Sequence, residues 1–339
     1  MQPGKISRNW KTIGGIALSL IFIYLAFRRV DLRQMGQALA AADYWYLLPV
    51  LAVTALGLVL RSWRWQYLLR PMRRVGVGVL FSSLCIGYMA NTFLPAHLGE
   101  VVRAWHASKK TGTAASSVFA TIVVERLIDV VSLLLLTGLA LMLFPFPGWV
   151  RQSGTAMLAL VGGLIVLLGL MKRHQQGTMA LCGRLLRFLP PATAARVREL
   201  LDQFLNGVVP LQRPAHYLAV GVLSLAIWVC YALTFQLLFY AFNFVESYRL
   251  PWTAALVAMV VTTISVVVPS SPGYVGTFHF LCQLSLGLFK VPRGPALSYA
   301  FVLHAISIFP VFFLGLFFLA RDRISLRSLR KEDIHAPDR

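Results

Sequence analysis

Acidic residues are scarce in this chain of 339 residues. Asp and Glu number 12 against 32 Lys and Arg, which gives a formal net charge of +20. Charged residues of both signs make up only 13% of the chain, whereas hydrophobic residues make up 58% and the mean hydropathy is +0.71. A soluble core does not need apolar runs of this number and length, so we expect a polytopic membrane protein. Because the short alternating strands of a membrane barrel are missing, helices are favoured.

Cysteines and enzyme signatures are also few or missing. The four cysteines have no paired spacing, so we expect free thiols and neither a disulfide framework nor a zinc site. The chain has no G-x-S-x-G, Walker loop, H-E-x-x-H or D-x-D sugar-nucleotide signature. We therefore predict a protein that is not an enzyme, with no catalytic residue, no metal and no cofactor.

The strong positive charge has a membrane explanation. Nucleic-acid binding needs a soluble basic face, but the arginines here lie between apolar runs, so we expect no nucleic-acid partner. The positive-inside rule and attraction to anionic lipid headgroups account for such arginines. The first run, 13–27, is followed by Arg28-Arg29 and not by a small-residue cleavage site, so we expect it to be a retained span.

Nine apolar runs predict about 6–8 transmembrane helices in an all-α fold. They fall at about 13–27, 45–60, 77–95, 115–143, 155–171, 216–241, 252–271, 274–289 and 296–320. We expect a single integral membrane domain over 1–320, with an amphipathic cytoplasmic segment at 172–213, and a basic cytoplasmic tail at 321–339. An alternative for 172–213 is a helical hairpin packed on its neighbours.

Loop charges predict which side of the membrane each run faces. With both termini in the cytoplasm of a bacterial cytoplasmic (inner) membrane, 24 basic residues lie inside, 7 lie outside and Arg126 lies within the membrane, which accounts for all 32. The arrangement requires 77–112 to begin and end inside, and 252–293 to begin and end outside. The cluster after the second run, assigned to a cytoplasmic loop, consists of Arg61, Arg64, Arg70, Arg73 and Arg74.

Both of these returning stretches contain a helix-breaking proline with a glycine four residues later. Pro95 precedes Gly99, and Pro272 precedes Gly276. Broken helices entered from opposite faces are typical of inverted-repeat transporters, whose site lies between them. We therefore predict two oppositely oriented broken or re-entrant segments in an inverted repeat. The alternative is an ordinary loop at each break, and the second stretch is nearly long enough to cross twice.

Charged residues inside an apolar run are the other candidate for a functional site. Glu125 and Asp129 are four residues apart and share a helix face, with Arg126 beside them. Ionisable groups are costly in hydrocarbon, so they usually face a partner, a cavity or a substrate path. Two interpretations stay open: a buried cluster engaged in function, and a structural cluster or one at the membrane surface.

Polar residues at the two breaks complete the candidate set. Glu100 and Arg103 can pair on one helical turn, and Arg103 or Arg126 suits a phosphate because guanidinium binds it through two parallel hydrogen bonds. Asn91 can bond backbone freed by the break or cap a helix. The turn that opens a helix at Thr277 can bind an anion or be an ordinary helix start. Its polar and glycine residues are Ser270, Ser271, Pro272, Gly273, Gly276 and Thr277.

Three motifs in series resemble the lysylphosphatidylglycerol synthase transmembrane-region family of flippase-like membrane proteins. They are Asn91-x-x-Leu-Pro-x-x-x-Gly-Glu100, Glu125-Arg-Leu-Ile-Asp129 and Pro269-Ser-Ser-Pro-Gly-x-x-Gly-Thr-Phe278. The resemblance implies movement of a membrane lipid or lipid-linked substrate, without the synthase activity, and specifies neither the lipid nor an oligomeric state.

Three functions follow from the residues and the resemblance. The first is a flippase for an anionic phospholipid or a lipid-linked (polyprenyl-phosphate) headgroup, with the residues named above as its binding or translocation site. The second is a non-transporting scaffold or regulator of envelope-lipid synthesis. The third is a membrane transferase acting on polyprenyl phosphate with Glu100 or Glu125 as base, which lacks a donor-binding signature.

Overall fold

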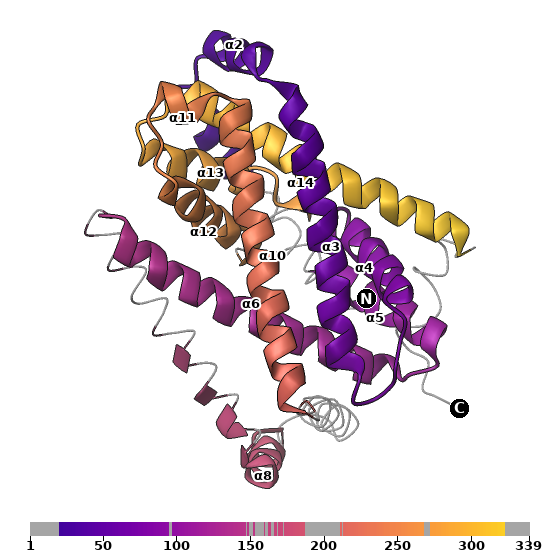
Figure 1. Ribbon diagram of the computed structural model, residues 1–339. Coiled ribbons are helices and arrows are strands. Elements are labelled where there is room, and N and C mark those ends of the chain that lie inside the picture. The colour runs from indigo at the N-terminus through magenta and orange to yellow at the C-terminus, as the bar shows by residue number, and fades with distance from the viewer. Residues whose placement is uncertain are drawn as a thin grey trace, which may run out of the picture. The chain divides into compact units, whose positions relative to one another are not determined.

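The computed structural model describes most of the hydrophobic chain (Figure 1). The described residues are 20–94, 97–146, 148, 152, 159, 162–163, 166–167, 169–171, 173–186, 211, 213–267 and 272–322. Every regular element among them is helical, which confirms the all-α class. Pro95, Ser270, Ser271, most of the segment 172–213 and almost all of the tail 321–339 lie outside them.

Four helices within the described part are long and apolar enough to cross a membrane. They are α3 (Leu47–Leu69) with the short turn Tyr44–Tyr46 before it, α6 (Ala115–Leu143), α10 (Pro214–Ala241) and α14 (Arg293–Arg321). Helices α6, α10 and α14 coincide with predicted runs, whereas α3 continues beyond the end of the predicted run 45–60. The predicted total of 6–8 also counts the runs 13–27 and 155–171, of which only about half of the residues are described, so that total stays a prediction.

The remaining helices are shorter. They are α2 (Leu32–Ala41), α4 (Val77–Asn91), α5 (Leu98–Thr111), α8 (Gln175–Leu185), α11 (Phe244–Ser247), α12 (Thr253–Val267), the turn η3 (Pro272–Tyr274) and α13 (Thr277–Gly287). With 15 residues, α4 and α12 are each roughly 22 Å long, short of a hydrocarbon core of about 30 Å. The short length of these two helices agrees with the prediction of broken segments. That each segment returns to the side of the membrane from which it enters stays a prediction.

The chain forms two compact units. Unit 1 consists of Met1–Leu60, Phe81–Arg103 and Ala226–Arg339, and unit 2 consists of Arg61–Leu80 and Ala104–Leu225. Several helices contribute residues to both. The prediction of one membrane domain over 1–320 stays a prediction.

Unit 1 contains both helix breaks. Its helix α12 packs on α13, α13 packs on α14, and α14 packs on α2 (Figure 1). Close approach of α4 to α14 depends on Gly315, where a Cβ would lie 2.8 Å from the carbonyl oxygen of Cys85 and 2.5 Å from the Met89 Cβ. Phe318 and Leu319 then pack on Cys85 and Met89 to form a buried apolar cluster.

Unit 2 has its own apolar core around Trp65. This side chain is fully buried and packs with residues of α4, α5, α6 and α10, among them Leu80, Ala107 and Ile122. Its indole Nε1–H donates to the Thr121 hydroxyl at 2.9 Å, which satisfies the polar edge of the ring. The end of α3 is therefore fixed against α6, next to the charged residues.

Candidate functional site

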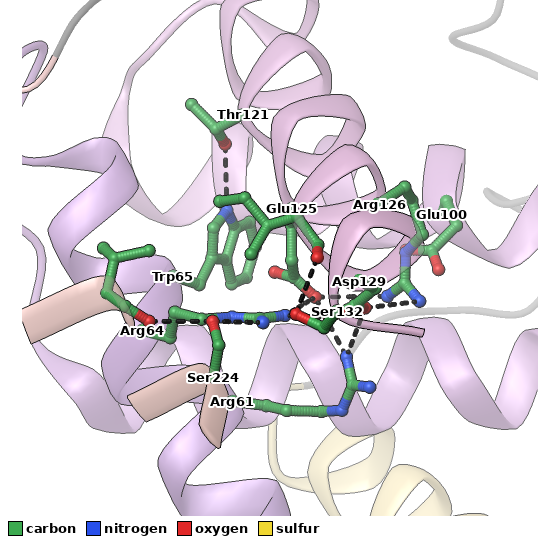
Figure 2. A network of polar contacts seen from close by, with 12 residues as sticks. Arg61, Arg64, Trp65, Glu100, Thr121, Glu125, Arg126, Asp129, Ser132 and Ser224 are labelled. Carbon is green, nitrogen blue, oxygen red and sulfur yellow. Dashed lines mark hydrogen bonds and ion pairs between the residues drawn. The ribbon is translucent and has the colours of Figure 1, made fainter. Parts of the chain in front are cut away.

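Arginines of α3 and carboxylates of α6 form a buried ionic network in unit 2 (Figure 2). Arg61 and Arg64 are three residues apart on α3, and Glu125 and Asp129 are four apart on α6, so each pair lies on one face of its helix. The two helices present these faces to each other. The side chains of Arg64 and Glu125 are 0% exposed, and those of Arg61 and Asp129 are 6% and 13% exposed.

Distances show that the carboxylates are shared between the arginines. Arg61 Nη1 lies 3.0 Å from Asp129 Oδ2 and 3.4 Å from Glu125 Oε1. Arg64 Nη2 lies 2.7 Å from Asp129 Oδ1 and 3.7 Å from Glu125 Oε1, and its Nη1 donates to the Ser224 hydroxyl of α10 at 3.0 Å. Such multiple charge-assisted contacts offset the cost of removing these ions from water.

Arg126 is the accessible member of the network. Its Nη2 lies 3.1 Å from Glu125 Oε1 and its Nη1 lies 3.4 Å from Asp129 Oδ2, yet its side chain is 38% exposed. The five side chains sum to a formal charge of +1, since three guanidinium groups accompany two carboxylates. An anion near Arg126 would therefore be electrostatically favourable.

The assignment of Arg61 and Arg64 to a cytoplasmic loop is wrong. Helix α3 continues through both residues to Leu69, because Trp65 and its neighbours extend the buried face beyond the end of the apolar run. One signal in the sequence could have revealed this. Arg61, Arg64 and Trp65 follow helical spacing, which is unusual for charges in a loop.

The two helix breaks meet in unit 1. His97, in the first break, places Nδ1 3.1 Å from the Tyr274 hydroxyl and Nε2 3.3 Å from the Val266 carbonyl oxygen, both in the second break or at its edge. A Cβ added to Gly273 would lie 3.9 Å from the Thr92 carbonyl oxygen. His97 and Tyr274 are 177 residues apart, and tertiary structure brings them side by side.

Each break has an unusual backbone. His97 and Tyr274 have φ of 56° and 57°, and Gly273 and Gly276 have φ of 70° and 90°. Positive φ is costly for residues with a Cβ and typically persists where surrounding structure enforces it. The glycines fit these positions without that cost.

The other candidate residues at the first break have structural partners. The Asn91 Oδ1 accepts from the Gly99 N–H at 2.7 Å, which fixes the start of α5 against the end of α4. Arg103 Nη1 lies 3.5 Å from Glu100 Oε2, as predicted from their spacing, and the Arg103 side chain is 0% exposed. A Cβ at Gly87 would lie 2.6 Å from the Arg103 Cβ, so Arg103 sits against the backbone of α4.

At the second break, Pro272–Tyr274 forms a 3-10 turn and Gly276 is the N-cap of α13. Thr277 is fully buried at the first position of that helix. Within the described residues, no group of three His, Cys, Asp or Glu side chains is arranged to hold a metal ion.

Comparison with known proteins identifies the family. The family described as Lysylphosphatidylglycerol synthase TM region matches residues 12–315. The chain belongs to this family. With its long apolar helices, it is a multi-pass membrane protein.

Two curated relatives are similar to the chain. One is named Glycosyltransferase AglD, from Haloferax volcanii, and is 23% identical over 338 residues, with 89% of this chain and 53% of the relative covered. The other is a UPF0104 membrane protein from Methanothermobacter thermautotrophicus, 25% identical over 246 residues, with 68% of this chain and 71% of the relative covered. The chain thus spans about half the length of the Haloferax relative. No solved structure matches it.

Proposed function

We propose that this protein is a flippase-like transporter that moves an anionic, phosphate-bearing lipid headgroup across a bacterial cytoplasmic membrane. It acts without enzymatic chemistry or cofactor. The lipid is a phospholipid or a lipid-linked sugar carried on a polyprenyl phosphate. Both termini face the cytoplasm in this proposal, as the loop charges predict.

The meeting of the two helix breaks is the observation that carries the proposal. In transporters with inverted repeats, discontinuous helices meet at the substrate site, and their irregular backbone is tolerated because it lines a polar cavity. Here His97 contacts Tyr274 and Val266, while Gly273 lies near Thr92. A scaffold without a polar path would not need two such breaks in contact.

Arg126 and Arg103 are the proposed headgroup contacts, and their different exposure suggests different roles. Arg126, 38% exposed and part of a network with formal charge +1, can meet a phosphate directly. Arg103 is fully buried beside Glu100, so it meets the headgroup only in a conformation in which that pair opens. Glu100, Glu125 and Asp129 would receive a cationic moiety of a headgroup.

Two alternatives remain. A scaffold or regulator of envelope-lipid synthesis would have the same fold. The name of the Haloferax relative supports a sugar-bearing lipid and also a transferase, for which Glu100 or Glu125 would be the base. The transferase ranks last because Glu125 is 0% exposed and already shared between three arginines.

Reconstitution into liposomes tests the proposal directly. Labelled phospholipids and polyprenyl-phosphate sugars are placed in the inner leaflet, and their exposure to a membrane-impermeant quencher or hydrolase is followed. We expect accelerated exposure of at least one anionic lipid over protein-free liposomes. If no lipid of a broad panel moves, the scaffold replaces the flippase.

Replacing Arg126 or Arg103 by lysine tests phosphate recognition. Lysine keeps the positive charge but cannot form the two parallel hydrogen bonds of a planar guanidinium group. We therefore expect transport to fall about tenfold, which corresponds to the loss of one charge-assisted hydrogen bond. Arg33→Lys, on the exposed face of α2, is the matched control and should transport at the wild-type rate. Wild-type transport by both test variants would exclude recognition through paired guanidinium hydrogen bonds.

A further inference from the structure

Two buried histidines hold the backbone of the second helix break. His304 of α14 places Nε2 2.8 Å from the Gly273 carbonyl oxygen. His279, the third residue of α13, places Nδ1 3.4 Å from the Gly276 amide nitrogen. The two side chains are 8% and 4% exposed, and their ring centroids are 4.8 Å apart. Both ends of the turn between Gly273 and Gly276 are therefore tied to imidazoles.

The backbone partners fix where the protons lie. A carbonyl oxygen only accepts, so His304 Nε2 carries its proton, and an amide N–H only donates, so His279 Nδ1 is bare. The neutral His279 then carries its proton on Nε2. That nitrogen is buried and has no hydrogen-bond partner among the described residues. In this closed arrangement His279 is therefore neutral, while His304 donates from its Nε2.

The surroundings of the pair do not favour a positive charge. Phe278 stacks on His304 at 4.6 Å, and Phe301 lies 4.3 Å from His279. Helices α12 and α13 contain no Asp, Glu, Lys or Arg, and the charged residues of α14 are at its ends. An imidazolium here would lack a counter-ion among those helices.

The elements around the pair also carry phenols and thiols, charged residues toward their ends, and Tyr274 of η3, which contacts His97. Cys282 lies on α13, and Tyr299 on α14 donates its hydroxyl to the Phe235 carbonyl oxygen. The segment before α2, which meets α13 through Phe22 and Phe280, carries Tyr24 and, next to α2, Arg28, Arg29 and Asp31. His304 is therefore the basic group that faces His279 within the described residues.

A proton added to His279 would disrupt the start of α13. The neutral ring acts as the acceptor that a Glu or Gln supplies in a capping box, and a protonated Nδ1 would point its own N–H at the Gly276 N–H. A cation in the first turn of a helix is also opposed by the helix dipole. In an open break, water would solvate the charge. Proton uptake and opening of the break are thus linked.

We propose that His279 and His304 form a proton-binding site and that proton uptake opens the second helix break. One proton from water adds to the bare Nδ1 of His279, the Gly276 N–H is released, and no other bond changes. A proton added to His304 would place a cation beside Phe278 with no counter-ion on α12 or α13, so it too is favoured in an open, hydrated break. One consequence of this inference rests on the proposed function: if the protein moves lipid, that movement is coupled to proton uptake.

The thermodynamic linkage between proton binding and opening of the second helix break gives the size of the pH effect. A hydrated histidine titrates near pH 6.5, so lowering the pH from 8 to 5.5 favours the open state about tenfold for each histidine that is protonated only there. Two such histidines give about a hundredfold change. The effect is present at low pH and absent above about pH 7.5.

Hydrogen exchange of the purified full-length protein in nanodiscs tests the inference without lipid transport. The observable is the protection factor of the peptide 272–280, which is already corrected for intrinsic exchange at each pH. We expect protection to fall between tenfold and a hundredfold from pH 8 to pH 5.5, while the middle of α10 keeps its protection. Unchanged protection of 272–280 in the wild type would overturn the inference.

Glutamine variants assign the response to the two rings. His279→Gln keeps a capping acceptor that does not titrate, so its response should shrink to about tenfold or less, and the double variant with His304→Gln should show none. His216→Gln, in unit 2, is the matched control and should respond like the wild type. A full response in the double variant would contradict the assignment.

Transport in proteoliposomes separates this inference from the proposed function. If the exchange response is present and no lipid moves, the proton site stands and the flippase fails. If lipid moves equally with and without a pH gradient and exchange is unaffected by pH, the flippase stands and the proton site fails.

Discussion

At the scale of single residues, the ionic network of unit 2 combines a stable core with one accessible cation. Arg61 and Arg64 are buried with their carboxylate partners, and Arg64 is further held by Ser224. Arg126 contacts the same carboxylates from a more open position. The buried arginines thus hold Glu125 and Asp129 in place, so that replacement of Arg126 alone does not leave them without a partner.

Removing a carboxylate should therefore cost more stability than removing Arg126. We predict that Glu125→Gln lowers the free energy of unfolding by about 3 kcal/mol, because Arg61 and Arg64 would then share a single buried carboxylate. Thermal unfolding of the purified protein in detergent measures the loss. Glu246→Gln in α11, which is exposed, is the matched control and should unfold like the wild type. Equal melting temperatures for both variants would show that the network is not stabilising.

At the scale of elements, glycines allow the broken helices to pack as tightly as they do. Gly87 and Gly99 let α4 and α5 approach backbone to backbone, and Asn91 joins the helix ends across the first break. At the second break, positive φ at Gly273 and Gly276 lets the chain turn into α13. With 15 residues each, α4 and α12 are by themselves shorter than the hydrocarbon core.

A methyl group at Gly99 should separate α4 from α5. The added Cβ would overlap the Gly87 carbonyl oxygen and the Asn91 side chain, both part of rigid helix ends. We predict that Gly99→Ala lowers the melting temperature clearly, by the equivalent of about 1–3 kcal/mol. Gly138→Ala in α6 meets nothing within 4 Å, so it should be neutral or slightly stabilising. Equal melting temperatures for Gly99→Ala and Gly138→Ala would contradict the prediction.

At the scale of the whole molecule, the loop charges predict that the two broken stretches are entered from opposite faces. Among the described cysteines, Cys85, Cys230 and Cys282 are buried and only Cys182 is partly exposed. A Cys182→Ser background is therefore suitable for labelling engineered thiols from one side of the membrane. Lys109, in the last turn of α5, and Lys290, after α13, are both exposed.

We expect Lys109→Cys to react with a membrane-impermeant thiol reagent only from the cytoplasmic side, and Lys290→Cys only from the opposite side. The reason is the predicted split of the basic residues, 24 inside to 7 outside, which remains 22 to 7 when Arg61 and Arg64 are assigned to helix α3. Right-side-out and inverted vesicles provide the two directions, and detergent-solubilised protein is the control for total reactivity. Labelling of both positions from the same side would contradict the inverted arrangement.

Patterns within continuous segments of the sequence were sufficient to predict many of the structural elements of this protein. Apolar runs of transmembrane length predicted the long helices α6, α10 and α14 almost to the residue, because hydrophobic length is a property of a continuous segment. The Pro and Gly positions predicted both breaks, and the spacing of Glu125 and Asp129 predicted their common face. The three motifs in series identified the family, which the match over residues 12–315 confirms.

Only the tertiary structure decided which distant residues meet. The sequence by itself determined the membrane class, the long helices α6, α10 and α14, the positions of the breaks and the charged segment of α6, since each depends on one continuous segment of the chain. It did not determine that Arg61 and Arg64 complete the ionic network, or that His97 contacts Tyr274 and His279 lies beside His304. Those contacts join residues 25 to 177 positions apart, and in a single sequence no periodicity spans such distances. Packing of the helices places them together, and with them the sites on which both proposals depend.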